Sequence, residues 1–142
     1  MKALLLNGPG KPFSIETIKD PTPEKGCAVA KVLACGSGLT IQHVKAGRIT
    51  VNYPRIIGHE ISGEIVEING HGGDLKIGTP VTAFFYLTCG HCRWCNIDRE
   101  TLCDNFRGYI GREIDGGYAE YIKLPIENFI KIPEEIDYKN NL

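Results

Sequence analysis

A chain of 142 residues, 42% of them hydrophobic and 23% charged, is long enough for one domain with a buried core and too short for a complete two-domain enzyme. Lys and Arg total 16 against 17 Asp and Glu, and no basic stripe is present, so we expect neither nucleic acid nor an anionic membrane as a partner. No apolar run approaches the roughly 18 residues of a membrane span and the N-terminus lacks a secretory apolar region, so we expect a cytoplasmic protein.

Short, β-branched segments separated by Gly and Pro predict a chain made mainly of strands. The segment 27–35 is almost entirely apolar, so we expect a central strand covered on both faces. The segment 61–69 alternates imperfectly and suits a partly covered barrel strand. Such short strands favour a β-barrel or sandwich, closed or partly closed so that few edges are free. The predicted strands lie near 2–7, 12–18, 27–35, 61–69, 79–85, 118–124 and 129–132.

Helical patterns are rare in this sequence. The stretch from Leu39 to Ala46 lacks Gly and Pro and places His43 at helical spacing from both ends, which predicts one short helix. A second helical turn is predicted over 97–102, with Asn96 as its N-cap.

Gly58-His59-Glu60 stands directly before the predicted strand at 61–69, and its glycine allows a close approach of the backbone. Taken alone, this pair is ambiguous. A histidine beside a carboxylate is more often a hydrogen-bonded structural residue than a metal ligand.

The segment 88–112 differs in kind from the strands around it and reads as an inserted lobe, called here the four-cysteine lobe. In a reducing compartment, clustered cysteines indicate metal ligands rather than disulfides. So short a segment has too little apolar surface to offset its ordering entropy, and a metal would organise it. Zinc held by four thiolates is closed to water and substrate, and is therefore structural. The four ligands, called here the four-cysteine cluster, are Cys89, Cys92, Cys95 and Cys103.

Other interpretations of the cluster fit less well. A ferredoxin-type iron–sulfur site would place its fourth cysteine three residues after the third, with a proline behind it, whereas Cys103 follows Cys95 after seven intervening residues and precedes Asp104. A redox dithiol would leave two cysteines unexplained. His91 could replace one thiol, although it lies between two better-spaced cysteines. Four unligated thiols would be unusual beside so many polar neighbours.

The order of these features along the chain is more specific than any one of them. In chain order they are Gly58-His59-Glu60-x2-Gly63-x6-Gly70, Gly78-x2-Val81, the four-cysteine lobe, Asp115-Gly116-Gly117-Tyr118-Ala119-Glu120-Tyr121 and Lys131-Ile132-Pro133. This series resembles, over essentially the whole chain, the N-terminal GroES-like catalytic domain of zinc-type medium-chain alcohol dehydrogenases and reductases. The resemblance implies a mainly β, partly open GroES-like barrel with a short helix and an inserted zinc-binding lobe. In a complete subunit, a Rossmann domain that binds NAD(P) follows.

The resemblance also implies roles for single residues. His59 matches a ligand of the catalytic zinc, Glu60 lies in or near the metal's first shell, Thr40 matches a residue that hydrogen-bonds the alcohol, and His43 matches a proton relay. The four-cysteine cluster matches a structural zinc site.

One ligand position departs from the family pattern. Gly38 stands where the zinc-binding cysteine is expected and Ile41 where an aspartate is usual, while Cys35 matches an earlier, non-ligating cysteine. A catalytic zinc needs three protein ligands. We therefore expect one zinc per chain, and a metal-free His59 that is hydrogen-bonded to Glu60 or to the backbone and shares a cleft with Thr40 and His43.

No Gly-x-Gly-x-x-Gly sequence is present, so we expect residues 1–142 to form a single domain with no cofactor-binding residues and no Rossmann domain. The leading hypothesis is the catalytic-domain part of an NAD(P)-dependent alcohol dehydrogenase-like oxidoreductase, inactive alone and needing a cofactor-domain partner or a homo-oligomer. Members without a catalytic zinc reduce activated double bonds, and Gly38 favours that chemistry. The alternative is a non-catalytic, zinc-stabilised binding or scaffold module. A free-standing redox protein fits least.

Overall fold

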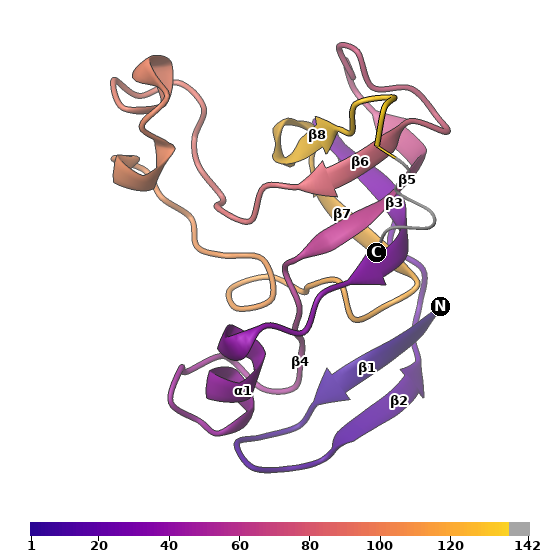
Figure 1. The fold of residues 1–142 in the computed structure, drawn as a ribbon, viewed down its shortest axis with the longest axis vertical. Helices are drawn as coiled ribbons and strands as arrows, with labels where there is room; N and C mark the ends of the chain where they lie inside the picture. The colour runs from indigo at the N-terminus through magenta and orange to yellow at the C-terminus, as the bar shows by residue number, and fades with distance from the viewer. Residues whose placement is uncertain (137–142) are drawn as a thin grey trace.

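The computed structural model describes residues 1–136 as a mainly β structure with one short helix (Figure 1). All the predicted strands are confirmed within a few residues. One two-residue strand, β4, was not predicted. The strands are β1 (Lys2–Leu6), β2 (Phe13–Thr17), β3 (Cys27–Cys35), β4 (Arg55–Ile56), β5 (Ile61–Asn69), β6 (Pro80–Ala83), β7 (Tyr121–Pro125) and β8 (Phe129–Lys131).

The strands form two antiparallel sheets, one in the order β2-β1-β4 and the other in the order β7-β3-β5-β6-β8. The segment 118–120 connects them, because the backbone N–H of Leu4 donates to Tyr118 O at 2.8 Å and that of Val32 donates to Glu120 O at 2.9 Å. Two sheets joined along one side in this way make a partly open barrel. The predicted GroES-like fold class is confirmed.

The strand predicted to be central, β3, lies inside the five-stranded sheet, but β5 occupies its middle. Complete burial of consecutive β3 residues is limited to Ala28, Val29 and Ala30, and Lys31 is exposed. The β3–β5 pairing is irregular after Val29 and again after Val32, so the outward face changes along the strand. The prediction that β3 is covered on both faces is therefore correct for only one third of the strand.

Two apolar clusters make up the core. The larger one lies over β3, β5 and β7 and includes the fully buried Ile65 and the almost fully buried Leu124. The second lies under α1 (Leu39–Lys45), where Ile41 and Val44 pack with Leu6 of β1. The predicted helix is confirmed, and its two buried residues fix which side of α1 faces the barrel.

The predicted helical turn over 97–102 is wrong. In its place are two 3₁₀ turns, η1 (Cys95–Ile97) and η2 (Glu100–Leu102), and Asn96 lies inside η1 instead of capping a helix. Asp98 separates them with a φ of 56°, a left-handed conformation that ends any continuous right-handed turn. A third 3₁₀ turn, η3, spans Ile126–Asn128. Within residues 1–136, no helix has the length and apolar character to cross a membrane.

The four-cysteine lobe leaves the barrel between β6 and β7, and the part that carries the cysteines stands apart from both sheets (Figure 1). The predicted end of the lobe at residue 112 is too late, because Ile110 already packs in the larger core cluster. Its base is a short antiparallel ladder in which the Leu87 N–H donates to Gly108 O at 2.9 Å and the Arg107 N–H donates to Leu87 O at 2.8 Å. A bridge between Tyr86 and Tyr109 continues this ladder toward the barrel. The lobe is thus attached through one narrow, hydrogen-bonded neck.

Candidate functional site

The four sulfur atoms of the four-cysteine cluster lie within 4.8 Å of one another. Measured pairs are 3.5 Å for Cys92–Cys95, 3.6 Å for Cys89–Cys103 and 4.0 Å for Cys92–Cys103. Four sulfurs about 2.3 Å from a tetrahedral zinc stand about 3.8 Å apart. None of the four is in a disulfide, so the donor set fits a zinc ion in number, chemistry and spacing.

The backbone of the lobe holds the thiols in place. The Cys89 N–H lies 3.4 Å from the Cys103 sulfur, and Cys95 opens η1. His91 turns away from the cluster, because its Nδ1 donates to the carbonyl oxygen of Cys89 at 2.6 Å. The imidazole is therefore engaged by the backbone and does not take the place of a thiol.

Hydrogen bonds and burial shift the pKa values of the thiols in opposite directions. A hydrogen bond from the His91 backbone lowers the pKa of Cys89 to about 6, and one from the Cys95 backbone lowers the pKa of Cys92. Desolvation raises the pKa of Cys95 to about 11. A bound divalent cation is the charge that allows neighbouring thiols to ionise together.

His59 and Glu60 line a second site, an open cleft of about 670 Å³. His59 is half-buried, and its ring lies 5.1 Å from that of Phe85. Within the described residues the imidazole makes no hydrogen bond, so the predicted bond to Glu60 or the backbone is wrong. The ring instead makes a tilted aromatic contact with Phe85, with an interplanar angle of 37°. The prediction that His59 lies in a cleft rather than in the core is confirmed.

The Glu60 carboxylate occupies the space beside two glycines. A Cβ added at Gly36 would collide with its Oε2, and one added at Gly38 would collide with its Oε1. The volume next to residue 38 is thus filled by a carboxylate in place of a thiolate. With no donor at Gly38, the cleft offers at most His59 and Glu60, which does not fit the three protein ligands of a catalytic zinc.

Cys35 does not make up the deficit. It lines the cleft, but its sulfur packs against the backbone of two glycines: a Cβ added at Gly58 would lie 2.7 Å from it, and one at Gly117 would lie 2.9 Å away. Burial raises the pKa of this thiol to about 11, so it is neutral near pH 7. Cys35 behaves as a packed, protonated thiol.

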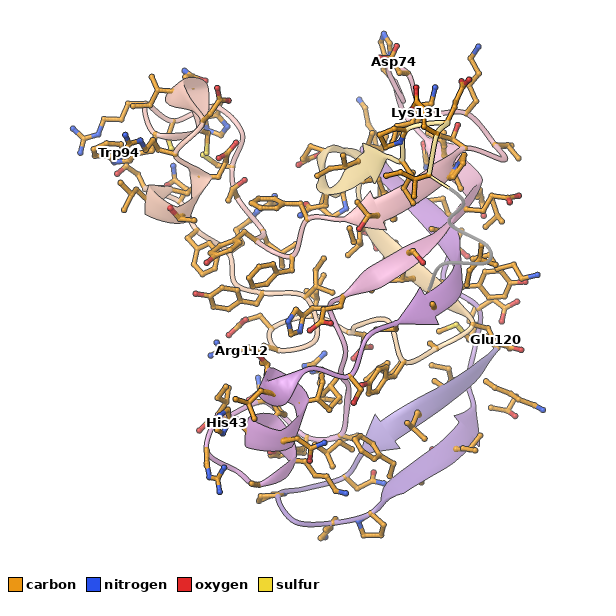
Figure 2. All side chains as sticks on the ribbon, in the orientation of Figure 1. His43, Asp74, Trp94, Arg112, Glu120 and Lys131 are labelled. Atoms are coloured by element: carbon orange, nitrogen blue, oxygen red, sulfur yellow. The ribbon has the colours of Figure 1, made fainter. Side chains whose placement is uncertain are left out.

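Thr40 and His43 lie on α1 and are not among the residues that line the cleft, which corrects the predicted shared cleft. The reason is the orientation of α1, which its buried residues Ile41 and Val44 set. His43, labelled on α1 in Figure 2, instead lies with its Nδ1 3.2 Å from Nη1 of Arg48.

Two contacts of these histidines were missed by sequence reasoning. Phe85 belongs to the apolar run that follows β6, and nothing in the local sequence shows that it contacts His59, which directly precedes β5. Arg48 had a readable signal, since Gly47 after a predicted helix is a typical helix stop.

The aromatic residues form a continuous contact from the cleft to the neck of the lobe. Phe85 lies 5.7 Å from Tyr109, and Phe106 lies 4.8 Å from Tyr109, measured between ring centroids. Arg112 places its guanidinium 4.7 Å from the ring centre of Tyr109. In Figure 2, Trp94 marks the lobe itself, beyond this aromatic neck. The cleft and the neck of the four-cysteine lobe are thus linked by packed aromatic side chains.

Residues 25–134 match the model of the alcohol dehydrogenase GroES-like domain. Among curated proteins, the chain is 37% identical over 141 residues to an alcohol dehydrogenase of Geobacillus stearothermophilus, covering 96% of this chain and 41% of that one. It is 36% identical over 122 residues to an L-threonine 3-dehydrogenase of Shewanella sp. strain ANA-3, covering 82% and 36%. The chain thus spans about two fifths of the length of these relatives.

Solved structures give the same picture. An alcohol dehydrogenase from Escherichia coli CFT073, in complex with NADH, superposes with a TM-score of 0.82 at 35% identity over 94% of this chain and 39% of that chain. A zinc-binding dehydrogenase from Sinorhizobium meliloti 1021, bound to NADP, superposes with a TM-score of 0.82 at 34% identity over 96% and 39%.

Proposed function

The chain belongs to the zinc-type medium-chain alcohol dehydrogenase and reductase family, as its N-terminal GroES-like domain, and from this premise we propose that it is the catalytic-domain part of an NAD(P)-dependent oxidoreductase. Its four-cysteine cluster holds one structural zinc, and its second metal site is incomplete. The observation that carries the proposal is the pairing of His59 and Glu60 in one cleft opposite a glycine at position 38.

The structural zinc would be held by the four-cysteine cluster. With all four positions taken by thiolates, the ion supplies cross-links within the lobe and no open coordination position for chemistry. The lobe has only one buried residue, Cys103, between Cys89 and Arg107. Its order therefore rests on the metal more than on burial.

In the cleft, the chain's own residues determine what binds. The wall combines the His59 imidazole and the Glu60 carboxylate with the apolar surfaces of Ala83 and Phe85. This composition suits a small molecule with one polar group. Because Gly38 supplies no metal ligand, the chemistry we favour is reduction of an activated double bond, in which the substrate's own carbonyl delocalises the charge.

NAD(P) is the cofactor of this chemistry and supplies or accepts the hydride when bound. The sequence offers no dinucleotide fingerprint, so we propose that the cofactor is held by a partner cofactor domain or in a homo-oligomer. We propose that residues 1–142 alone bind no NAD(P)H and are inactive, and that the protein acts in the cytoplasm.

The alternative function is a zinc-stabilised binding or scaffold module without chemistry. Gly38 and Ile41 favour it, since both depart from the family pattern at positions linked to catalysis.

A chimera separates the two. The chain is joined to the remainder of the Geobacillus alcohol dehydrogenase, and NAD(P)H oxidation is followed with simple aldehydes and with α,β-unsaturated ketones. The oxidoreductase proposal expects turnover of the unsaturated ketones that drops with His59→Phe. A folded chimera that binds NADH but turns over neither substrate class supports the module.

A further inference from the structure

The C-terminus of α1 ends in a Schellman turn. Gly47 follows the C-cap residue Ala46 with a φ of 73°, the left-handed conformation that glycine adopts at no steric cost. The Gly47 N–H donates to Val44 O at 3.0 Å, and the Arg48 N–H donates to His43 O at 2.9 Å. This pair of hydrogen bonds defines the motif and brings the side chain of Arg48 back against that of His43.

In most Schellman turns these two positions make an apolar contact. Here they are an arginine and a histidine, with Arg48 Nη1 3.2 Å from His43 Nδ1. A guanidinium has five N–H donors and no acceptor, so His43 Nδ1 must be the acceptor of this bond. A neutral imidazole whose Nδ1 accepts carries its proton on Nε2.

We propose that Arg48 is a positioning residue that locks His43 in the Nε2–H tautomer and makes it a fixed hydrogen-bond donor rather than a proton relay. The relay role that the resemblance implies for His43 needs a ring nitrogen with a lone pair that can accept a proton. With a proton already on Nε2 and a guanidinium on Nδ1, His43 has no free lone pair to receive one. The inference concerns the side chains at the end of α1, outside the His59 cleft, and does not depend on the proposed function.

The turn itself makes this arrangement robust. Its hydrogen bonds are between backbone groups, and residues Ile41 and Val44 anchor α1 to the core. A Cβ at Gly47 would lie 2.8 Å from the Cβ of Pro9, so the turn has no room for a side chain at position 47.

The same chain contains two reference imidazoles. His71 Nδ1 accepts from the backbone N–H of Gly73 at 3.0 Å, which requires the Nε2–H tautomer. His91 Nδ1 donates to the carbonyl oxygen of Cys89 at 2.6 Å, which requires the opposite tautomer. Both assignments follow from partners that can only donate or only accept.

Long-range ¹H–¹⁵N spectra of the zinc-loaded, ¹⁵N-histidine-labelled chain, at a pH where the imidazoles are neutral, test the proposal. We expect His43 to give the pattern of His71, with a pyridine-type Nδ1 and a pyrrole-type Nε2. In Arg48→Met, which keeps an apolar contact in the turn, the two His43 nitrogen shifts should move toward each other as the tautomers exchange. Arg48→Lys should restore their separation.

The matched control is Arg99→Met, which removes the same charge from the exposed surface of the lobe and should leave His43 unchanged. A wild-type His43 with its proton on Nδ1, or an Arg48→Met spectrum identical to the wild type, would overturn the proposal. The wild-type spectrum decides the first point even if a variant does not fold. Because no cofactor or turnover is needed, failure of this test is distinct from failure of the proposed function.

Discussion

The four-cysteine lobe and the His59 cleft are two candidate metal sites that are built in opposite ways. In the lobe, all ligands come from fifteen consecutive residues, 89–103, and their sulfurs converge within 4.8 Å. In the cleft, the family's ligands come from separate segments, and here one position is Gly38, beside which the Glu60 carboxylate lies. A local site can be recognised from one sequence motif, whereas a site assembled from distant segments can lose one ligand while the others remain in place.

The largest expected effect separates the lobe from the barrel. Cys95→Ser removes one of four zinc ligands, and structural zinc sites of this type contribute on the order of 10 kcal/mol. We expect zinc to fall from one per chain to none and protease cleavage to begin within 88–112, while the amides of β3 and β5 stay protected from hydrogen exchange. Cys27→Ser, outside the lobe, should change neither. Cooperative unfolding of the whole chain would show that the lobe is part of the main core.

A change in the barrel should have the converse result. Ile65 is fully buried in the larger core cluster, so Ile65→Ala should lower the free energy of unfolding by about 2–5 kcal/mol. Zinc content should remain one per chain, since none of the four cysteine ligands lies on β5 or on a strand that pairs with it. Urea denaturation together with elemental analysis measures both. Zinc loss in the folded variant would mean that the two regions are coupled.

The cleft can be tested by restoring its missing donor. Gly38 has a φ of −75°, which any residue adopts, and the colliding Glu60 carboxylate is the end of an exposed, flexible side chain. Gly38→Cys should therefore fold and take up a second zinc, held by the new thiolate with His59 and Glu60. Gly38→Ala has the same Cβ and no thiol, and should stay at one zinc. Equal metal content in the two variants would contradict the assignment of position 38.

The smallest effect concerns the strained turn of the lobe. Asp98 adopts a φ of 56°, which glycine populates at little cost. Asp98→Gly should leave zinc content unchanged and alter stability by less than about 1 kcal/mol, whereas Asp98→Ala should destabilise the lobe by about that amount. Competition with a zinc chelator, followed over time, would reveal the difference. A weaker hold on zinc in Asp98→Gly than in Asp98→Ala would be inconsistent with this account of the turn.

The strands of this fold were predictable because Gly and Pro mark their ends and the apolar pattern repeats within each. β4 escaped prediction, since two residues between Pro54 and Ile57 have no periodicity to detect. The helical turn at 97–102 failed for another reason. Converging thiols dictate the path of the chain there, and the left-handed Asp98 breaks what local propensity would continue.

The same distinction applies to the sites. Spacing alone was enough to identify the four-cysteine cluster, because its geometry is local. The positions of Thr40 and His43 depend on how Ile41 and Val44 seat α1 against β1, which no local pattern encodes. The tilted contact between His59 and Phe85 likewise joins segments far apart in the sequence.

We propose that this chain has one complete metal site and one incomplete site. Elemental analysis of the purified wild-type chain, after removal of loosely bound metal by desalting, tests it most directly. We expect one zinc per chain and no other transition metal. Two tightly held zincs, no zinc, or iron with a visible charge-transfer band would contradict it.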